Sequence, residues 1–116
     1  MLAKDIEQIE AMPYGENALK RRVFAAEDGV PTFAMRIFDV APGGASSRHS
    51  HDFEHEVLIL KGEGVLKGEK GDIPFKAGTA LYIEPNELHQ LRNTGTDTLR
   101  FLCMVPLRGE EPAPTT

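Results

Sequence analysis

Short apolar runs, broken at close intervals by glycine and proline, constrain the fold of this chain more than any other feature. The 116 residues include 11 glycines and eight prolines. No stretch of a dozen residues repeats its apolar positions with the 3.6-residue period of a helix, and the best helical candidate, residues 2–9, is short. This punctuation is typical of β-sandwiches and β-barrels, so we expect an all-β fold.

The expected strands are segments in which apolar residues alternate with polar ones or form a short continuous run. They are residues 19–24, 32–40, 47–51, 55–60, 79–83, 88–92 and 99–105. Turns are expected at residues 42–44, 61–64, 68–72, 84–87 and 93–97. A chain of 12.8 kDa predicts one domain, residues 1–108, and the polar, proline-containing residues 109–116 predict a disordered tail.

All four histidines lie in two short segments. His49, His51 and His55 fall within seven residues, and His89 stands apart. Neutral imidazole is the commonest protein ligand for transition metals, which usually recruit it in clusters. On a strand, positions 49 and 51 face the same side, about 6.6 Å apart, so both rings can reach one ion. The clustering predicts a single metal site built from both segments.

Composition and charge exclude several classes of protein. A net charge of −5 argues against nucleic-acid binding, which needs a basic face. No apolar run approaches the roughly 20 residues of a membrane span, and residues 1–7 carry charges where a signal peptide is apolar. The one cysteine, Cys103, allows no intramolecular disulfide and fits a reducing compartment. We therefore expect a cytoplasmic protein without nucleic-acid or membrane partners.

The spacing of glycines around the first three histidines resembles the first motif of the cupins, which are small jelly-roll, or double-stranded β-helix, barrels. Five residues separate Gly43 from His49, and His51 follows two positions later. Three residues separate His51 from His55, and six residues separate His55 from Gly62. The family's motif has a glutamate where this chain has His55. The resemblance implies a cupin barrel with this segment at its metal site.

The second cupin motif is matched with small departures. Gly78, His89 and Asn93 keep the family's spacing. Pro85 comes one position late and Glu87 stands where a glycine is expected, but both departures concern the turn rather than the ligand. Together the two motifs, residues 43–62 and 78–93, span nearly half of the chain.

The third metal ligand is either His55 or Glu56. The position of Gly62 favours His55, whereas a looser form of the motif accepts Glu56, four residues after His51. Adjacent residues on a strand face opposite ways, so both are not expected to face the metal. We favour His55, because the chain looks most like small bacterial single-domain cupins with a four-histidine manganese site.

That resemblance implies one divalent transition metal per chain. Its ligands are His49, His51, His55 and His89. Manganese is expected first, with iron, nickel, cobalt, copper or zinc as alternatives, because imidazole binds all of these metals. Binding should weaken below about pH 6.5, where free imidazole takes up a proton.

Residues 51–55 also match H-x-x-E-H, the inverted zinc-peptidase signature. That signature requires a helix, because positions four apart then share a face. The following apolar run and glycines indicate a strand and a turn instead, and His49 and His89 would have no role. We therefore favour the cupin interpretation.

The reaction stays open, because cupins include dioxygenases, isomerases, decarboxylases, sugar-binding modules and storage proteins. An octahedral metal with four histidines keeps two positions for other ligands, whereas tetrahedral zinc would be closed and structural. Our first hypothesis is a metal-dependent oxidoreductase of the dioxygenase type that acts on a small organic molecule. The alternatives are a non-catalytic metal-dependent module for a small molecule or sugar, and a metal-dependent isomerase. No catalytic residue can be named from the sequence.

Other residues near the motifs have ordinary structural explanations. Cys103 is expected in the core, although it could project toward the metal, and Tyr82 is the only tyrosine near a motif. Arg36, Arg92 and Arg100 alternate with apolar residues and are expected to face outward, whereas an inward arginine would favour an acidic substrate. Apolar residues of both parities at 57–60 and 99–105 suit a sheet covered on both faces, which favours a homodimer.

Overall fold

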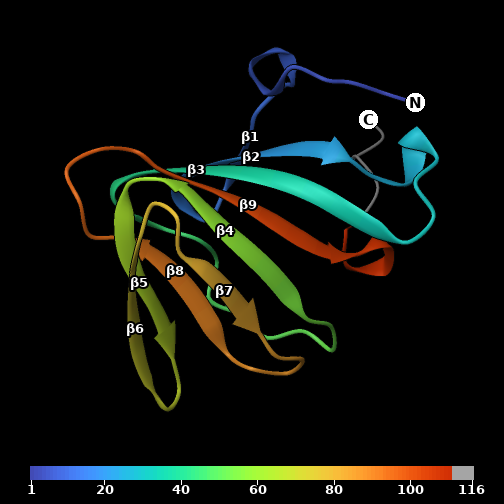
Figure 1. Ribbon diagram of the computed structural model, residues 1–116. Helices are drawn as coiled ribbons and strands as arrows, with labels where there is room; N and C mark the ends of the chain where they lie inside the picture. The colour runs from blue at the N-terminus through green and yellow to red at the C-terminus, as the bar shows by residue number, and fades with distance from the viewer. Residues whose placement is uncertain (111–116) are drawn as a thin grey trace.

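The computed structural model describes residues 1–110 (Figure 1). The domain consists of antiparallel strands along which buried and exposed residues alternate. The strands are β1 (Met12–Tyr14), β2 (Glu16–Phe24), β3 (Phe33–Ala45), β4 (His55–Lys61), β5 (Glu63–Gly68), β6 (Gly71–Lys76), β7 (Ala80–Ile83), β8 (His89–Asn93) and β9 (Leu99–Pro106). Three short 3₁₀ turns accompany them: η1 (Ile6–Gln8), η2 (Ala26–Asp28) and η3 (Leu107–Gly109). The all-β prediction is confirmed.

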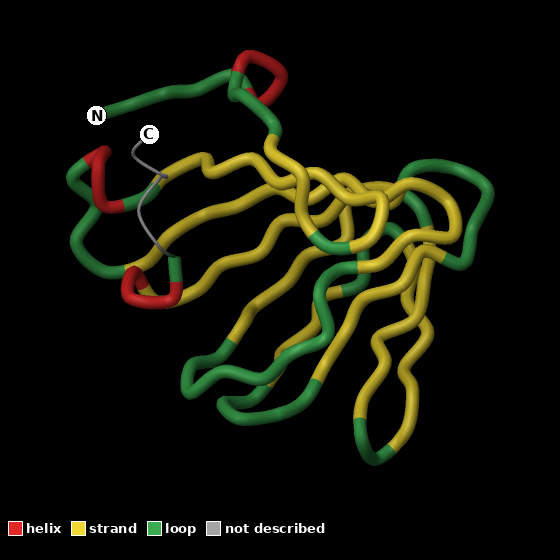
Figure 2. The backbone as a smooth tube through the Cα atoms, turned by 180° about the vertical axis from the view of Figure 1, so that it is seen from behind, coloured by secondary structure: helices red, strands yellow, loops and turns green. Residues whose placement is uncertain are grey.

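One antiparallel sheet curls into a barrel-like trough (Figures 1 and 2). Its strand order is β6-β5-β8-β3-β9-β4-β7, with β2 also paired to β3 and β1 to β2. The long strand β3 lies along β9 from Phe33 to Val40 and reaches β8 at Ala45. In the middle of the sheet, β3 pairs with β9, and β8 and β4 lie on either side of this pair. Both β4 and β8 begin with a histidine, and the curl of the sheet brings these two strand starts together.

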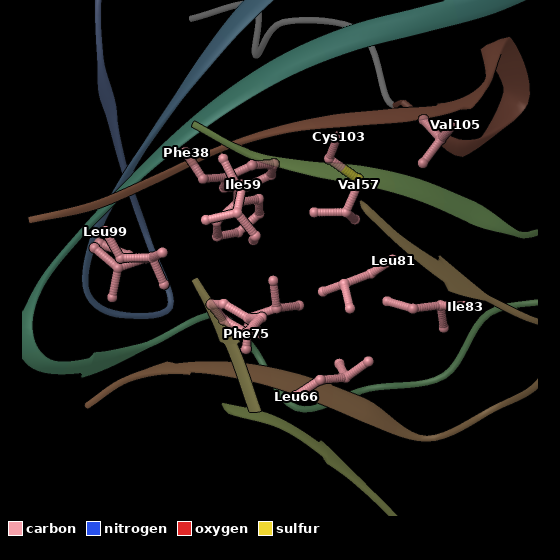
Figure 3. Close-up of a cluster of buried hydrophobic side chains, with 14 of the residues drawn as sticks. Phe38, Val57, Ile59, Leu66, Phe75, Leu81, Ile83, Leu99, Cys103 and Val105 are labelled. Carbon is pink, nitrogen blue, oxygen red and sulfur yellow. The ribbon is translucent and has the colours of Figure 1, made fainter. Parts of the chain in front are cut away.

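The core fills the inside of the curled sheet with side chains from β3 to β9. Figure 3 shows Phe38, Ile59, Phe75 and Leu81 directed into this common space. Phe38 stacks on Phe101 with ring centroids 5.0 Å apart, and Ile59 is only 1% exposed. Truncating a buried phenylalanine in such a core to alanine typically costs about 3–5 kcal/mol, so this interior fixes the positions of the strands that hold the histidines.

The expected turn at residues 42–44 is wrong, because β3 continues to Ala45. A Cβ on Gly44 would lie 2.5 Å from the carbonyl oxygen of Glu16, and Gly43 has a φ of 80°. The glycines thus let β2 pass closely over a bulged strand, where the pairing shifts between Glu16 and Ala18.

Two other local predictions need correction, and the rejection of a third is confirmed. The candidate helix at 2–9 contains only the 3₁₀ turn η1, and residues 47–51 contain an isolated bridge at His49 in place of a strand. Residues 51–55 pass from a bend into β4, so the helix that the peptidase signature requires does not form. Short segments like these depend on tertiary pairing more than on their own residues.

The C-terminal part of the described chain is more ordered than the sequence indicates. Gly109 ends η3 and Glu110 is buried, although the sequence predicts that a disordered tail begins at residue 109. The rest of that predicted tail, residues 111–116, lies outside the described residues. Arg36 is also buried, contrary to the outward orientation expected for it. It is stabilised there because it donates to a carboxylate oxygen of Glu110 at 2.7 Å. No helix within residues 1–110 has the length and apolar character needed to cross a membrane.

Candidate metal centre

The four histidines come together from three parts of the chain. His49 and His51 lie on the segment between β3 and β4, His55 begins β4 and His89 begins β8. Backbone hydrogen bonds of 3.2 and 3.1 Å join His49 and His89 in both directions, so the first segment is held against β8. The rings of His49 and His51 have centroids 4.1 Å apart, in agreement with the same-side orientation predicted from their spacing.

Three of these side chains form a group suited to a metal ion. One ring nitrogen each from His49, His51 and His89 lies within 4.8 Å of the other two. Nitrogen ligands about 2.1 Å from a common ion lie at most about 4.2 Å apart, so a small closure of the rings brings all three to bonding distance. The donor set fits a divalent transition metal, because imidazole nitrogen suits these ions.

His55 borders this group. Its ring centroid lies 4.7 Å from that of His89 and 5.5 Å from that of His51. The His55 side chain is buried, and its Nε2 atom has no hydrogen-bond partner. Glu56, the alternative ligand from the sequence, is exposed and lies opposite Tyr82 on the pairing of β4 with β7. The two adjacent residues therefore face opposite sides of β4, as strand alternation requires.

Contacts behind the rings hold two of them in place. The Nδ1 atom of His89 lies 2.8 Å from the backbone oxygen of Glu87, which can only accept a hydrogen bond. His89 therefore carries its proton on Nδ1, and its Nε2 lone pair is free for a metal. Phe53 stacks on His51 with centroids 4.5 Å apart and planes 5° apart, which fixes the orientation of that ring.

The surroundings keep His49, His51 and His55 neutral. Burial lowers the pKa of His49 to about 4 and that of His55 to about 3, and neighbouring positive charge, including Arg36, acts in the same direction. Burial also lowers the pKa of His51, with a further contribution from His89. Metal binding requires unprotonated imidazole, so the environment favours the binding form.

A small cavity of about 20 Å³ lies next to the histidines. Its lining includes His49, His55 and His89 together with Tyr14 and Cys103, and the other residues are Phe38, Ser46, Val57, Ile83, Leu91 and Phe101. About 10–15 Å³ is enough for one water molecule, so the cavity suits an ion or a small ligand atom. No carboxylate is among these lining residues, so acid–base chemistry there would depend on tyrosine, cysteine or histidine.

The structure distinguishes the two residues whose orientation the sequence left open. Cys103 lines the cavity, whereas Tyr82 is 59% exposed on the outside of the sheet. The tyrosine at the site is Tyr14, which packs on Phe38 with centroids 4.9 Å apart. Sequence reasoning missed it because β1 has three residues, too few to show a strand pattern. Its pKa is raised, chiefly by burial, so it is a protonated phenol at neutral pH.

Comparison with known proteins indicates the family to which this fold belongs. The cupin domain family matches residues 36–105. The oxalate-binding protein of Thermotoga maritima is 39% identical over 105 residues, covering 87% of this chain and 86% of that protein. The 1-methylthio-D-xylulose 5-phosphate methylsulfurylase of Rhodospirillum rubrum is 34% identical over 98 residues, which are 82% of this chain and 60% of that enzyme. 

A similar structure is that of the polyketide cyclase RemF from Streptomyces resistomycificus. It is 27% identical, and the match has a TM-score of 0.84 and covers 97% of this chain and 82% of the cyclase. These relatives have different activities, so they agree on the fold and not on a reaction. The sequence match over residues 36–105 and the jelly-roll architecture identify the chain as a member of the cupin family.

Proposed function

We propose that His49, His51, His55 and His89 hold one divalent transition metal, manganese first, and that this centre oxidises a small chelating organic anion with dioxygen as the oxidant. The observation that carries the proposal is the buried Nε2 of His55, which has no partner and lies beside three other imidazoles. Leaving such a nitrogen unpaired costs about 1–3 kcal/mol, a cost that a metal bond removes.

The surroundings support a small anionic ligand. Four neutral imidazoles leave the charge of a dication uncompensated, and the buried cation Arg36 lies just behind Cys103. A six-coordinate ion with these ligands keeps two positions, which suits a bidentate carboxylate or dioxygen. When bound, the metal would supply Lewis acidity and one-electron chemistry. The apolar walls, Phe38, Val57 and Phe101, limit the size of the ligand.

The test starts from protein freed of metal by a chelator. Titration with Mn²⁺ should give one ion per chain, and X-ray absorption should give five or six ligands including water. Oxalate is a suitable first ligand, because the 39% identical relative from Thermotoga maritima is an oxalate-binding protein. Oxygen uptake and product formation are then measured with oxalate and other small carboxylates. A closed four-coordinate ion, or no metal binding, contradicts the proposal.

A second candidate is a binding module without turnover. It is favoured by the absence of a carboxylate among the residues that line the cavity and by the binding role in that relative's name. Tight oxalate binding with no oxygen uptake and no product would favour it. An isomerase needs an acid–base group beside the metal, and Tyr14 is the candidate for that role. Tyr14→Phe would then abolish isomerisation while leaving metal affinity unchanged.

We also propose that the protein forms a homodimer and is located in the cytoplasm. Leu58, Leu60 and Tyr82 lie exposed on the outer face of β4 and β7, where a second copy of the chain would cover them. Light scattering should give twice the chain mass for the wild type, and Leu58→Lys should give monomers with an unchanged far-UV spectrum. A monomeric wild type at micromolar concentration contradicts the dimer.

A further inference from the structure

The sulphur of Cys103 lies between the candidate metal centre and the buried ion pair of Arg36 and Glu110. Its Sγ atom lies 3.4 Å from Nδ1 of His55 and 3.2 Å from Nη2 of Arg36. Figure 3 shows Cys103 on β9 beside Val57 of β4, its partner in the strand pairing, and His55 precedes Val57 by two residues on the same face. The contact between Cys103 and His55 therefore follows from the register of two central strands.

The protonation of His55 decides whether this ring can bind a metal. A neutral imidazole has one N–H donor and one bare nitrogen. With the proton on Nδ1, the ring donates to Cys103 and leaves a bare Nε2 that can bind a metal. With the proton on Nε2, an N–H group would be buried without an acceptor, because Nε2 has no hydrogen-bond partner. Only the first tautomer is compatible with both the packing and metal binding.

We propose that Cys103 is a positioning residue, whose sulphur accepts the Nδ1 proton of His55 and so directs the bare Nε2 of that ring into the metal centre. This inference rests on the proposed function. It gives His55 the same kind of support that the backbone oxygen of Glu87 gives His89 at 2.8 Å. Metal-binding histidines commonly donate their second N–H in this way, and such partners set ring orientation and basicity.

Arg36 holds the sulphur in place. This residue lies opposite Cys103 in the pairing of β3 with β9, and it donates from Nε to the Cys103 backbone oxygen at 3.3 Å as well as from Nη2 to the sulphur. Glu110 accepts from the remaining nitrogen, Nη1, at 2.7 Å. A guanidinium group only donates, so Arg36 leaves the sulphur in the role of acceptor. Arg36 thus requires a sulphur that accepts hydrogen bonds, and the Nδ1-protonated form of His55 uses the same property.

The direct test reads the tautomer of His55 in metal-free protein. Histidine labelled with ¹⁵N gives long-range proton–nitrogen correlations that distinguish a proton on Nδ1 from one on Nε2, and the signal lost in His55→Gln assigns the ring. The wild type should carry the proton on Nδ1. Cys103→Val fills the space without an acceptor and should shift His55 toward the Nε2 tautomer. Cys103→Ser keeps an acceptor and should restore the wild-type tautomer.

Mn²⁺ titration of the same proteins gives the second readout. Cys103→Val should weaken Mn²⁺ binding by roughly 10- to 100-fold, the usual effect of losing such a partner. The matched control is Val105→Ala, which disturbs a buried residue of the same face of β9 two positions away. It should change neither the tautomer nor the Mn²⁺ affinity.

Two results overturn the inference: a wild-type His55 protonated on Nε2, or a Cys103→Val protein with the wild-type tautomer and affinity. If the wild type binds no metal, the proposed function fails separately. The tautomer pattern of the metal-free proteins then still decides whether Cys103 orients His55.

Discussion

Replacing Glu110 by glutamine should destabilise the fold strongly, because this carboxylate holds three cations in the interior. Its side chain is 2% exposed. It accepts hydrogen bonds from Lys20 at 3.0 Å, from Arg22 at 2.7 Å and from Arg36 at 2.7 Å. Glutamine keeps the shape of the side chain but loses its charge. Its amide nitrogen also places two N–H donors beside the N–H donors of Lys20, Arg22 and Arg36. The three cations come from β2 and β3, so the change weakens the attachment of the C-terminal segment to both strands.

The size of the effect follows from the burial of the partners. Removing one member of a buried ion pair typically costs about 3–5 kcal/mol. The side chains of Lys20, Arg22 and Arg36 are 17%, 10% and 8% exposed, so they can regain some hydration in the variant. We therefore expect the lower end, about 3 kcal/mol. With a urea m-value of about 1.5 kcal/mol/M, the unfolding midpoint falls by about 2 M.

Equilibrium urea unfolding, followed by fluorescence and circular dichroism, measures this loss. The matched control is Glu27→Gln, which removes a 49% exposed carboxylate that also pairs with Arg22. That change should cost less than about 1 kcal/mol, as is usual for an exposed pair. A Glu110→Gln protein whose free energy of unfolding is within about 0.5 kcal/mol of the wild type, with an unchanged m-value, would refute the reasoning.

The pH dependence gives an independent check on the same carboxylate. Burial alone would raise the pKa of Glu110, but hydrogen bonds from Lys20, Arg36 and Arg22 outweigh it and lower this pKa below 4.5. A carboxylate with a lowered folded-state pKa stabilises the protein above its unfolded-state pKa, and this contribution is lost as the pH falls through the folded-state value. The difference between the wild type and Glu110→Gln should therefore be constant above about pH 5 and shrink below about pH 4.5.

Three further predictions concern the metal centre and the sheet. His55→Ala should weaken Mn²⁺ binding by more than the roughly 10- to 100-fold expected for losing a residue that only hydrogen-bonds a metal ligand, whereas Glu56→Ala should leave Mn²⁺ binding unchanged. Calorimetry that showed the reverse would indicate a site of three histidines and one glutamate. The pKa of His49 is about 4 and that of His55 is about 3, so these two rings should stay unprotonated and able to bind Mn²⁺ below the pKa of free imidazole. Protonation of His55 would then not cause the loss of Mn²⁺ affinity at low pH, and a pH series should show the wild type and His55→Ala losing affinity over the same range. Gly64→Ala should lower the free energy of unfolding by about 1–3 kcal/mol or more, because the new Cβ would lie 2.1 Å from the backbone oxygen of Arg92. An unchanged melting temperature in thermal unfolding would contradict the close approach of β5 and β8.

The sequence predicted the parts of this protein that depend on local patterns. Strand alternation separates buried His55 from exposed Glu56, and the position of Gly62 had favoured the same residue for the site. The glycines and short apolar runs were sufficient for an all-β fold. The assignment of all four histidines to one ion is a prediction, since the close group of ring nitrogens contains His49, His51 and His89.

The contacts that the sequence could not predict all join residues far apart in the chain. Arg36 alternates with apolar neighbours as an outward-facing residue would, and only its partner Glu110, 74 positions later, explains its burial. Glu110 itself lies in a polar segment whose composition predicts disorder. Tyr14 reaches the site because β1 pairs with β2 and lies over Phe38, which no local pattern encodes.

Arg36 links the stability of the C-terminal segment to the candidate metal centre, and its contacts indicate how the two effects can be separated. Its Nη1 atom binds Glu110, whereas Nε and Nη2 bind the backbone oxygen and the sulphur of Cys103. Of these three contacts of Arg36, Glu110→Gln changes only the first, so the sulphur can still accept the proton of His55. The Glu110 change should therefore lower the free energy of unfolding far more than the Mn²⁺ affinity, and Cys103→Val should do the opposite. If both variants lowered both quantities in parallel, Arg36, Cys103 and His55 would have to move as one unit, and the role assigned to the sulphur alone would be wrong.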